Sequence, residues 1–90
     1  MFKLKIEKVA KAGTLESNDI FIMVSPNEEG KVEIELESIV MKQFGDDILR
    51  VIKEKLDELG VESVTLKAQD KGALDYTIGA RVETVIQRAI

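Results

Sequence analysis

The segment Ile20–Val24 most constrains the fold of this chain, because every one of its residues is apolar. A β-strand alternates its side chains between two faces, so a strand without a polar face is expected to be covered on both sides. Asp19 precedes the segment, and the turn-forming cluster Ser25–Gly30 follows it. The segment therefore predicts a central or nearly central strand of a β-sheet.

Three further segments alternate apolar and polar residues, namely Phe2–Glu7, Lys31–Glu37 and Val61–Ala68. A period of two is typical of a strand with one face on the core and one in water. Because only a turn cluster separates Asp19–Val24 from Lys31–Glu37, these two segments are predicted to form a β-hairpin. The stretch between Val9 and Asn18 has no such period and is predicted to be an exposed loop.

Two segments carry apolar residues at helical spacing instead. The first stripe consists of Ile48, Ile52, Leu56 and Leu59. Its helix is predicted to end at Gly60 and to be capped at its start by Asp46 or Asp47. The second stripe runs from Leu74 to Ala89.

The second helix is predicted to begin between Gly72 and Ile78, so the elements follow in the order β-β-β-α-β-α. This order is typical of an α+β fold. We expect a mostly antiparallel sheet of three to four strands with two helices packed on one face. A chain of 90 residues is too short to divide its core, so residues 1–90 are expected to form a single domain.

The composition excludes several kinds of functional site. The chain has no Cys and no His, so a disulfide framework, a thiolate nucleophile, a Ser-His pair and the usual zinc site are excluded. Lys and Arg number 13 and Asp and Glu number 17, which gives 13 − 17 = −4. Without a basic stretch, nucleic acid is not an expected partner. The charged N-terminal segment lacks a long apolar block, so no membrane association and a cytoplasmic location are expected.

The carboxylate clusters have structural explanations. Asp46 and Asp47 could be paired carboxylates or magnesium ligands, but helix capping and the helix dipole explain them better. Other acidic residues are interpreted as solvated surface in a turn or on a strand face, namely Glu28, Glu29, Glu33, Glu35 and Glu37.

The C-terminal third contains three weaker candidates for a functional site. Asp70–Asp75 is interpreted as a strand-to-helix connection in which Gly72 permits a strained backbone and an Asp forms a cap. Arg81 and Glu83 are interpreted as ordinary exposed helix charges, with Arg81 available to a partner. Tyr76, the only tyrosine, belongs to the core or to its rim.

The polar loop ahead of Ile20 contains Ser17, its most accessible chemical group. A serine hydroxyl without an adjacent base is a poor nucleophile, so Ser17 suits the role of an acceptor better than that of a catalyst. By residue chemistry alone, a turn serine remains the simpler interpretation of the Ser17–Asp19 cluster.

The segment Ala12–Asp19 resembles the acyl carrier protein of citrate lyase, also called its gamma chain. Three other segments also resemble blocks of that family, in the same order and at similar spacing: Lys42–Gly45, Asp70–Asp75 and Ala80–Glu83. The resemblance therefore covers nearly the whole chain.

The resemblance implies that Ser17 is linked through a phosphodiester to a phosphoribosyl-dephospho-coenzyme A group. Gly13, Thr14, Leu15, Glu16, Asn18 and Asp19 would form the recognition loop around it. Asn18 occupies a position where the family often has Gly, and Asn tolerates the left-handed conformation best after Gly. A chain without Cys needs such an imported thiol to present a thioester.

The resemblance also implies the partners. A transferase (alpha) subunit would exchange acetyl for citryl on the arm, a lyase (beta) subunit would cleave citryl to oxaloacetate, and a prosthetic-group transferase would attach the arm. The chain itself would be a carrier without catalytic residues. Two alternatives remain open: a non-covalent α+β regulatory or subunit-binding module, and the carrier of a related lyase or decarboxylase.

Overall fold

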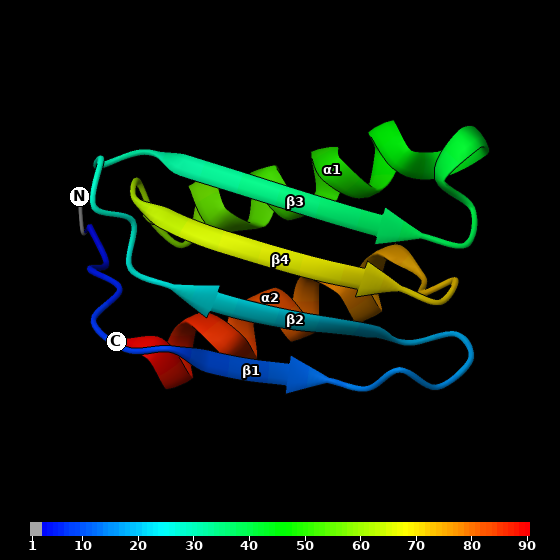
Figure 1. Ribbon diagram of the computed structural model, residues 1–90, viewed down its shortest axis with the longest axis horizontal. Helices are drawn as coiled ribbons and strands as arrows, with labels where there is room; N and C mark the ends of the chain where they lie inside the picture. The colour runs from blue at the N-terminus through cyan, green and yellow to red at the C-terminus, as the bar shows by residue number, and fades with distance from the viewer. Residues whose placement is uncertain (1–2) are drawn as a thin grey trace.

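A computed structural model describes residues 3–90 of the chain. The elements are β1 (Ala10–Gly13), β2 (Ile20–Ser25), β3 (Val32–Ser38), α1 (Met41–Glu58), β4 (Val64–Asp70) and α2 (Asp75–Ala89). The strands form a sheet in the order β1-β2-β4-β3, and both helices lie behind one of its faces (Figure 1). The predicted α+β class is confirmed.

The sheet is mostly antiparallel, as predicted, but one predicted strand pairing does not form. β2 pairs antiparallel with β1 and with β4, whereas β3 pairs parallel with β4. The predicted hairpin of Asp19–Val24 with Lys31–Glu37 is therefore wrong, because β4 lies between the two strands. Helix α1 connects β3 to its parallel neighbour β4, as parallel strands require a crossover.

The connection between β2 and β3 is fastened to the start of β4 rather than folded into a tight turn. The side-chain amide of Asn27 donates a hydrogen bond to the Thr65 hydroxyl at 3.1 Å. The Ser63 hydroxyl in turn donates to the carbonyl of Asn27 at 3.1 Å. The residues that these hydrogen bonds join are 36 to 38 positions apart in the sequence, so no local sequence pattern predicts the contacts.

The first strand lies in a segment that was predicted to be a loop. Ala10 and Ala12 of β1 are buried against α2, whereas their small side chains give no strong alternation in the sequence. The predicted strand at Phe2–Glu7 is wrong over its described part, where Leu4 makes only an isolated bridge to Val61. Phe2 lies outside the described residues.

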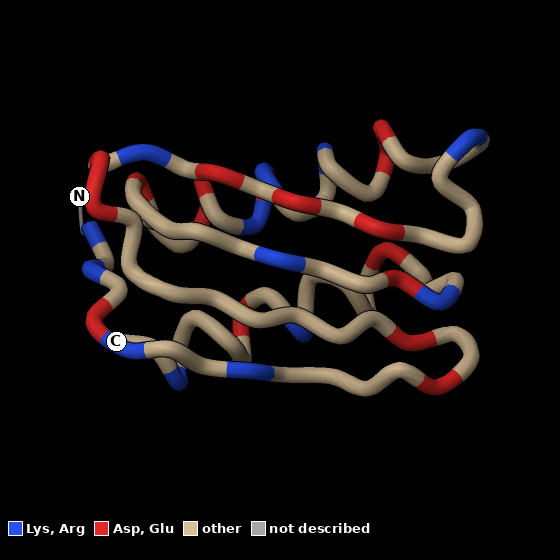
Figure 2. Tube along the Cα trace, viewed as in Figure 1, with Lys and Arg blue, Asp and Glu red and all other residues tan. Residues whose placement is uncertain are grey.

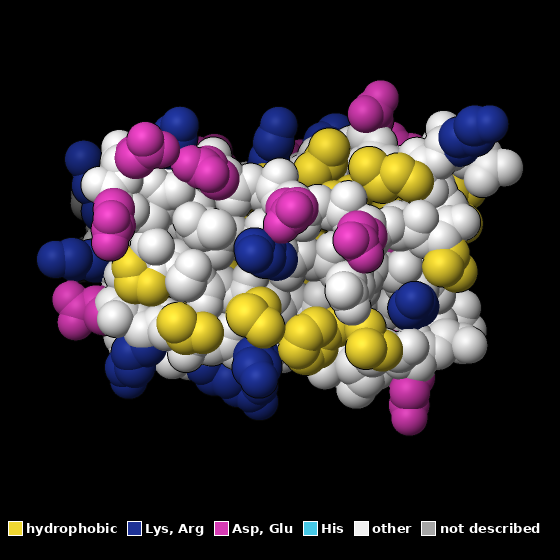
Figure 3. Space-filling view, in the orientation of Figure 1, with side chains coloured by type: hydrophobic (Ala, Val, Ile, Leu, Met, Phe, Trp, Pro, Cys, Tyr) yellow, Lys and Arg dark blue, Asp and Glu magenta, His cyan; other side chains and the backbone are white. Residues whose placement is uncertain are grey.

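Strand β2 is interior, as predicted, but only one of its faces is covered. Ile20, Ile22 and Val24 are at most 1% exposed and face the helices. Phe21 and Met23 are half-buried on the open face, so the prediction of cover on both sides is wrong. Figure 3 shows apolar side chains along this open face and a row of acidic side chains beside them, which follows β3 in Figure 2.

The helices bury most of the predicted stripes, but Leu59 follows α1 and is only partly buried, and Leu74 precedes α2 and is exposed. Ile48, Ile52 and Leu56 of α1 are at most 4% exposed, and α2 begins at Asp75 within the predicted interval. Helix α1 begins earlier than predicted, at Met41, with Val40 as N-cap and no side-chain capping bond. Asp46 and Asp47 therefore lie inside the helix, and the prediction that one of them caps it is wrong.

Within residues 3–90, neither helix combines the length and the apolar character that crossing a bilayer needs.

Candidate functional site

The geometry of the sheet brings three connections to one end of the molecule. Ile20 and Ser38 both lie opposite Asp70, and Gly13 lies opposite Phe21. The connections after β1, β3 and β4 and the starts of both helices therefore share this end, on the right in Figure 1. We call it the loop end, and residues Thr14–Asp19 within it the Ser17 loop.

The Ser17 loop is built around a tight turn. The backbone N–H of Asp19 donates to the carbonyl of Glu16 at 3.2 Å, which places Ser17 and Asn18 at the two central positions. Asn18 has a φ of 65°, as the third residue of a type II turn requires. The prediction that Asn18 tolerates the left-handed conformation is confirmed.

Asp19 fastens the loop to helix α2 through Arg81. Its Oδ1 and Oδ2 accept hydrogen bonds from Arg81 Nε at 3.0 Å and from Arg81 Nη2 at 2.9 Å. Oδ2 also accepts from the Thr14 hydroxyl at 2.7 Å, and Oδ1 from the backbone of Ile20 at 2.7 Å. The hydrogen bond from Arg81 is the largest cause that lowers the pKa of Asp19 to about 2. This bidentate pair holds a carboxylate whose side chain is only 13% exposed.

The backbone of the Ser17 loop is also paired with the connection between β4 and α2. The N–H of Asn18 donates to the carbonyl of Lys71 at 2.8 Å, and the N–H of Lys71 donates to the carbonyl of Asp19 at 2.9 Å. These two bonds extend the pairing of β2 with β4 beyond the strand ends. The two residues that follow Ser17 are thereby held by the rest of the fold.

Asp70 organises the other side of the loop end. Its side chain is buried, at 1% exposure, and its carboxylate accepts hydrogen bonds from three donors. The donors are the Ser38 hydroxyl at 2.7 Å, the Gly72 N–H at 3.1 Å and the Ala73 N–H at 3.0 Å. Asp70 therefore joins the end of β3 to the connection that contacts the Ser17 loop.

Ser17 itself is exposed at the tip of the turn. The side-chain hydrogen bonds within the loop connect Thr14, Glu16, Asp19 and Arg81, and within residues 3–90 the Ser17 hydroxyl takes part in none of them. An exposed hydroxyl without a neighbouring base is chemically an acceptor for a group that another protein transfers. Hydrogen bonds hold the backbone of Asn18 and Asp19 next to it, while no hydrogen bond to another of the described residues engages the Ser17 oxygen.

The other candidate residues do not assemble into a site. Asp46 and Asp47 are exposed on α1, and across residues 3–90 no group of three or more potential ligands could hold a metal ion. The acids of β3 lie along the open face of the sheet, away from the Ser17 loop (Figure 2). Tyr76 is 77% exposed, so it belongs to neither of the positions predicted for it.

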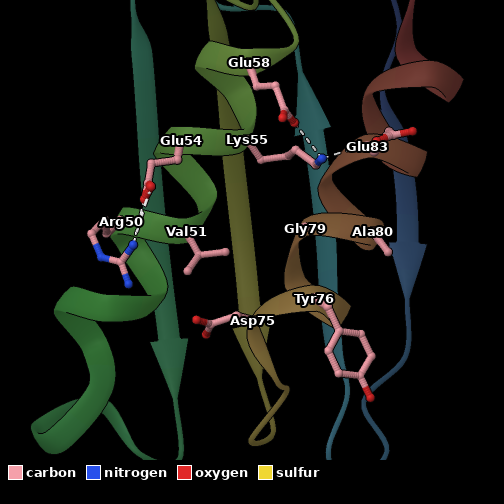
Figure 4. Close-up of a pocket in the computed structure, with 10 residues that line it drawn as sticks. All are labelled: Arg50, Val51, Glu54, Lys55, Glu58, Asp75, Tyr76, Gly79, Ala80 and Glu83. Carbon is pink, nitrogen blue, oxygen red and sulfur yellow. Dashed lines mark hydrogen bonds and ion pairs between the residues drawn. The ribbon is translucent and has the colours of Figure 1, made fainter.

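A hollow between the two helices is lined by side chains that form ion pairs (Figure 4). Lys55 lies between Glu58 at 2.7 Å and Glu83 at 3.4 Å, and the hydrogen bond that Lys55 donates to Glu58 is the largest cause that raises the Lys55 pKa. Arg50 pairs with Glu54 at 2.7 Å. These charges satisfy one another on the surface, which leaves no free cation here for a phosphate.

Two residues of the loop end were missed by the sequence interpretation. Arg81 was taken for an exposed charge, and no local signal reveals a partner 62 residues away. Asp70 did have a signal, because the alternation of Val64, Leu66 and Ala68 places residue 70 on the buried face. A carboxylate at such a position predicts several hydrogen-bond donors around it.

The Asp19–Arg81 pair predicts a pH dependence of stability. The pKa of Asp19 is lower in the folded chain than its ordinary value of 3.8, so its stabilising contribution is present above that value and lost as the pH falls toward 2. Asp19→Asn should lower the free energy of unfolding by about 1–2 kcal/mol near neutral pH, a figure reduced for the solvent exposure of Arg81. The difference should shrink between about pH 4 and 2 in urea titrations.

A double-mutant cycle supplies the control for this prediction. Once Asn replaces Asp19, Arg81→Gln should cost little more, because the charged partner is already gone. Additive losses from the two substitutions would contradict the assignment of the pair as one stabilising unit.

Comparison with known proteins identifies the family. A model of the family "ACP: Malonate decarboxylase delta subunit (MdcD)" matches residues 7–89. The chain is 48% identical over 86 residues to the citrate lyase acyl carrier protein of Halothermothrix orenii, covering 96% of this chain and 90% of that protein. It is 53% identical over 87 residues to the corresponding protein of Leuconostoc mesenteroides subsp. cremoris, covering 97% and 89%.

Solved structures support the fold. A chain of a Pseudomonas malonate decarboxylase hetero-tetramer, crystallised with malonate, superposes with a TM-score of 0.84 over 98% of this chain and 90% of that one. At 17% sequence identity, this similarity supports the fold of the chain and not its function. With relatives near half identity over almost the full length, the chain belongs to the family of citrate lyase acyl carrier proteins, which are carriers and not catalysts.

Proposed function

We propose that this chain carries acetyl and citryl thioesters on a phosphoribosyl-dephospho-coenzyme A arm attached to Ser17. The observation that supports this most directly is the Ser17 hydroxyl, which is exposed and makes no hydrogen bond within residues 3–90, on a loop that the Asp19–Arg81 pair fastens to α2. The arm would supply the thiol that a chain without Cys lacks.

The residues around Ser17 fit a covalently attached group. The turn leaves Ser17 at its tip, and Thr14, Leu15, Glu16 and Asn18 are exposed around it for a prosthetic-group transferase to recognise. Gly13 and Asp19 serve as the two fixed ends of this recognition loop. A phosphodiester at Ser17 would require no rearrangement of the Asp19–Arg81 pair, since the Ser17 oxygen makes no bond to it.

The role of the chain itself is presentation. It would bring the loaded arm first to a transferase (alpha) subunit and then to a lyase (beta) subunit of a citrate lyase complex. Because tethering raises the local concentration of the thioester to about the millimolar range, strong docking contacts are not needed. We further propose that residues 1–90 act as one acyl-carrier domain and that the complex works in the cytoplasm.

Intact-mass measurement tests this proposal. Co-expression with the modifying enzymes should add the mass of the arm to the chain, and Ser17→Ala should abolish that addition and citrate cleavage together. Ser25→Ala is the matched control, because Ser25 lies at the far end of β2 and should keep the modification. An unmodified wild-type mass under these conditions would contradict the proposal, and intact citrate cleavage by Ser17→Ala would favour a non-covalent binding module.

A second candidate is the carrier of a malonate decarboxylase. The matching family model favours it, whereas the relatives near 50% identity favour citrate lyase. Reconstitution with the catalytic subunits of each complex separates the two: the carrier should support turnover in only one of them.

A further inference from the structure

An open groove lies at the loop end, between the first turns of α1 and α2. Its volume is about 680 Å³, within the range of small-molecule sites. The apolar residues that line it are Val40, Phe44, Ile48, Ala73, Leu74 and Tyr76. We call it the Phe44–Tyr76 groove. Ile48 belongs to the core, whereas Phe44, Leu74 and Tyr76 are more than half exposed.

The exposure of these side chains requires an explanation, because large apolar groups gathered in a hollow mark a binding site more often than an inert surface. Phe44 is 53% exposed, Leu74 59% and Tyr76 77%. In Figure 4, the Tyr76 ring points away from the ion pairs of Lys55. The Tyr76 ring therefore takes no part in the ion pairs between the helices and can contact a ligand.

The groove adjoins the Ser17 loop. Gly72 lines the groove, and a β-carbon at Gly72 would lie 3.8 Å from the side-chain oxygen of Asn18. Asn18 directly follows Ser17 and is hydrogen-bonded to the residue before Gly72. A group attached to Ser17 thus reaches the groove by extending past Asn18, the next residue of the Ser17 loop.

The charges around the groove determine which part of a group attached to Ser17 can bind there. Asp47 and Asp75 lie at its edge, so phosphates would be repelled from it. Arg50 is also at the edge, but its guanidinium already bonds Glu54 at 2.7 Å. An uncharged aromatic base fits better, because its ring can stack on Phe44 or Tyr76 and its amino group can donate to a carboxylate.

We propose that the Phe44–Tyr76 groove holds the adenine of the arm attached to Ser17, so that the nucleotide folds back against its own carrier. This inference rests on the proposed function. Because the base is tethered, shallow contacts are sufficient to populate the bound position. The thiol-bearing part of the arm then extends away from a defined anchor instead of from a freely moving nucleotide.

Tyr76 provides a direct probe, since it is the only tyrosine and the chain has no tryptophan. Emission of Tyr76 should be compared between the unmodified chain and the chain whose intact mass includes the arm. We expect the modified chain to lose about half of the emission or more through stacking of the base on or beside the ring. Proton NMR should show the adenine ring protons shifted upfield.

Matched variants locate the effect. Phe44→Ala and Leu74→Ala should restore the emission and the proton shifts toward those of an unbound arm. Val9→Ala removes an equally exposed apolar side chain, 62% exposed, at the opposite end of the sheet, and should leave both signals as in the modified wild type.

The outcomes separate this inference from the proposed function. An absent mass increment overturns both. A present increment with unchanged Tyr76 emission and unshifted adenine protons overturns the groove assignment alone. If Phe44→Ala then slowed turnover with the catalytic subunits without changing these signals, the groove would be a protein-docking surface, which also overturns the assignment.

Discussion

Replacing Gly13 by alanine is expected to lower the free energy of unfolding by about 3 kcal/mol or more. Gly13 has a φ of +87°, a conformation that costs an L-residue about 1–2 kcal/mol. The added β-carbon would also lie 1.8 Å from the carbonyl oxygen of Ile20, a backbone atom that cannot move aside without shifting β2. The strain would act on both ends of the Ser17 loop.

Gly30→Ala is the matched control for this substitution. Gly30 also has a positive φ, of +71°, but nothing lies within 4 Å of its added β-carbon. Its loss should be about 1 kcal/mol, because only the backbone term applies. Urea unfolding of the two variants at one pH measures the difference, and equal losses would show that the contact with Ile20 does not matter.

Replacing Asp70 by alanine should cost about 3 kcal/mol, the second large effect expected. The substitution removes the acceptor of three hydrogen bonds and leaves the Ser38 hydroxyl and the Gly72 and Ala73 N–H groups without it. Each donor left without its partner in a partly buried setting is costly, and the connection that pairs with the Ser17 loop would loosen. Modification of Ser17 should therefore slow as well.

Two further variants test the Asp70 prediction. Asp57→Ala removes an exposed carboxylate from α1 and should change stability by no more than about 0.5 kcal/mol. Asp70→Asn keeps one acceptor oxygen and should fall between the wild type and Asp70→Ala. Thermal or urea unfolding measures all three, and a loss for Asp70→Ala no larger than that for Asp57→Ala would contradict the role assigned to Asp70.

The class of fold and most of its elements were predictable because they depend on local periodicity. The stripes of α1 and α2, the apolar run of β2 and the alternation in β3 and β4 reflect which side chains must leave water. Strand β1 was not predictable in the same way, since Ala10 and Ala12 are too small to mark a buried face. The start of α1 was misplaced because its first turn, at the loop end, carries exposed Met41 and Phe44 instead of a capping residue.

The pairing of the strands was not predictable from local periodicity. Sequence proximity favoured a hairpin of β2 with β3, but the parallel β3-α1-β4 unit places β4 between them. Contacts of the Asn27 connection with Thr65 and Ser63 support that arrangement across long separations. Partner choice of this kind depends on which surfaces are complementary once the whole sheet is assembled, and no window of sequence contains that information.

The sequence by itself determined that this chain forms an α+β fold, that it has no thiol or imidazole of its own, and that Ser17 lies in a polar loop of a carrier family. Only the tertiary structure decided how that loop is held, because Asp19 and Arg81 are separated by 62 residues and meet through the packing of α2 against the sheet. The same packing brought the Phe44–Tyr76 groove beside Asn18 of the Ser17 loop. Local sequence specifies which side chains are available, whereas distances between remote residues exist only after the core has formed.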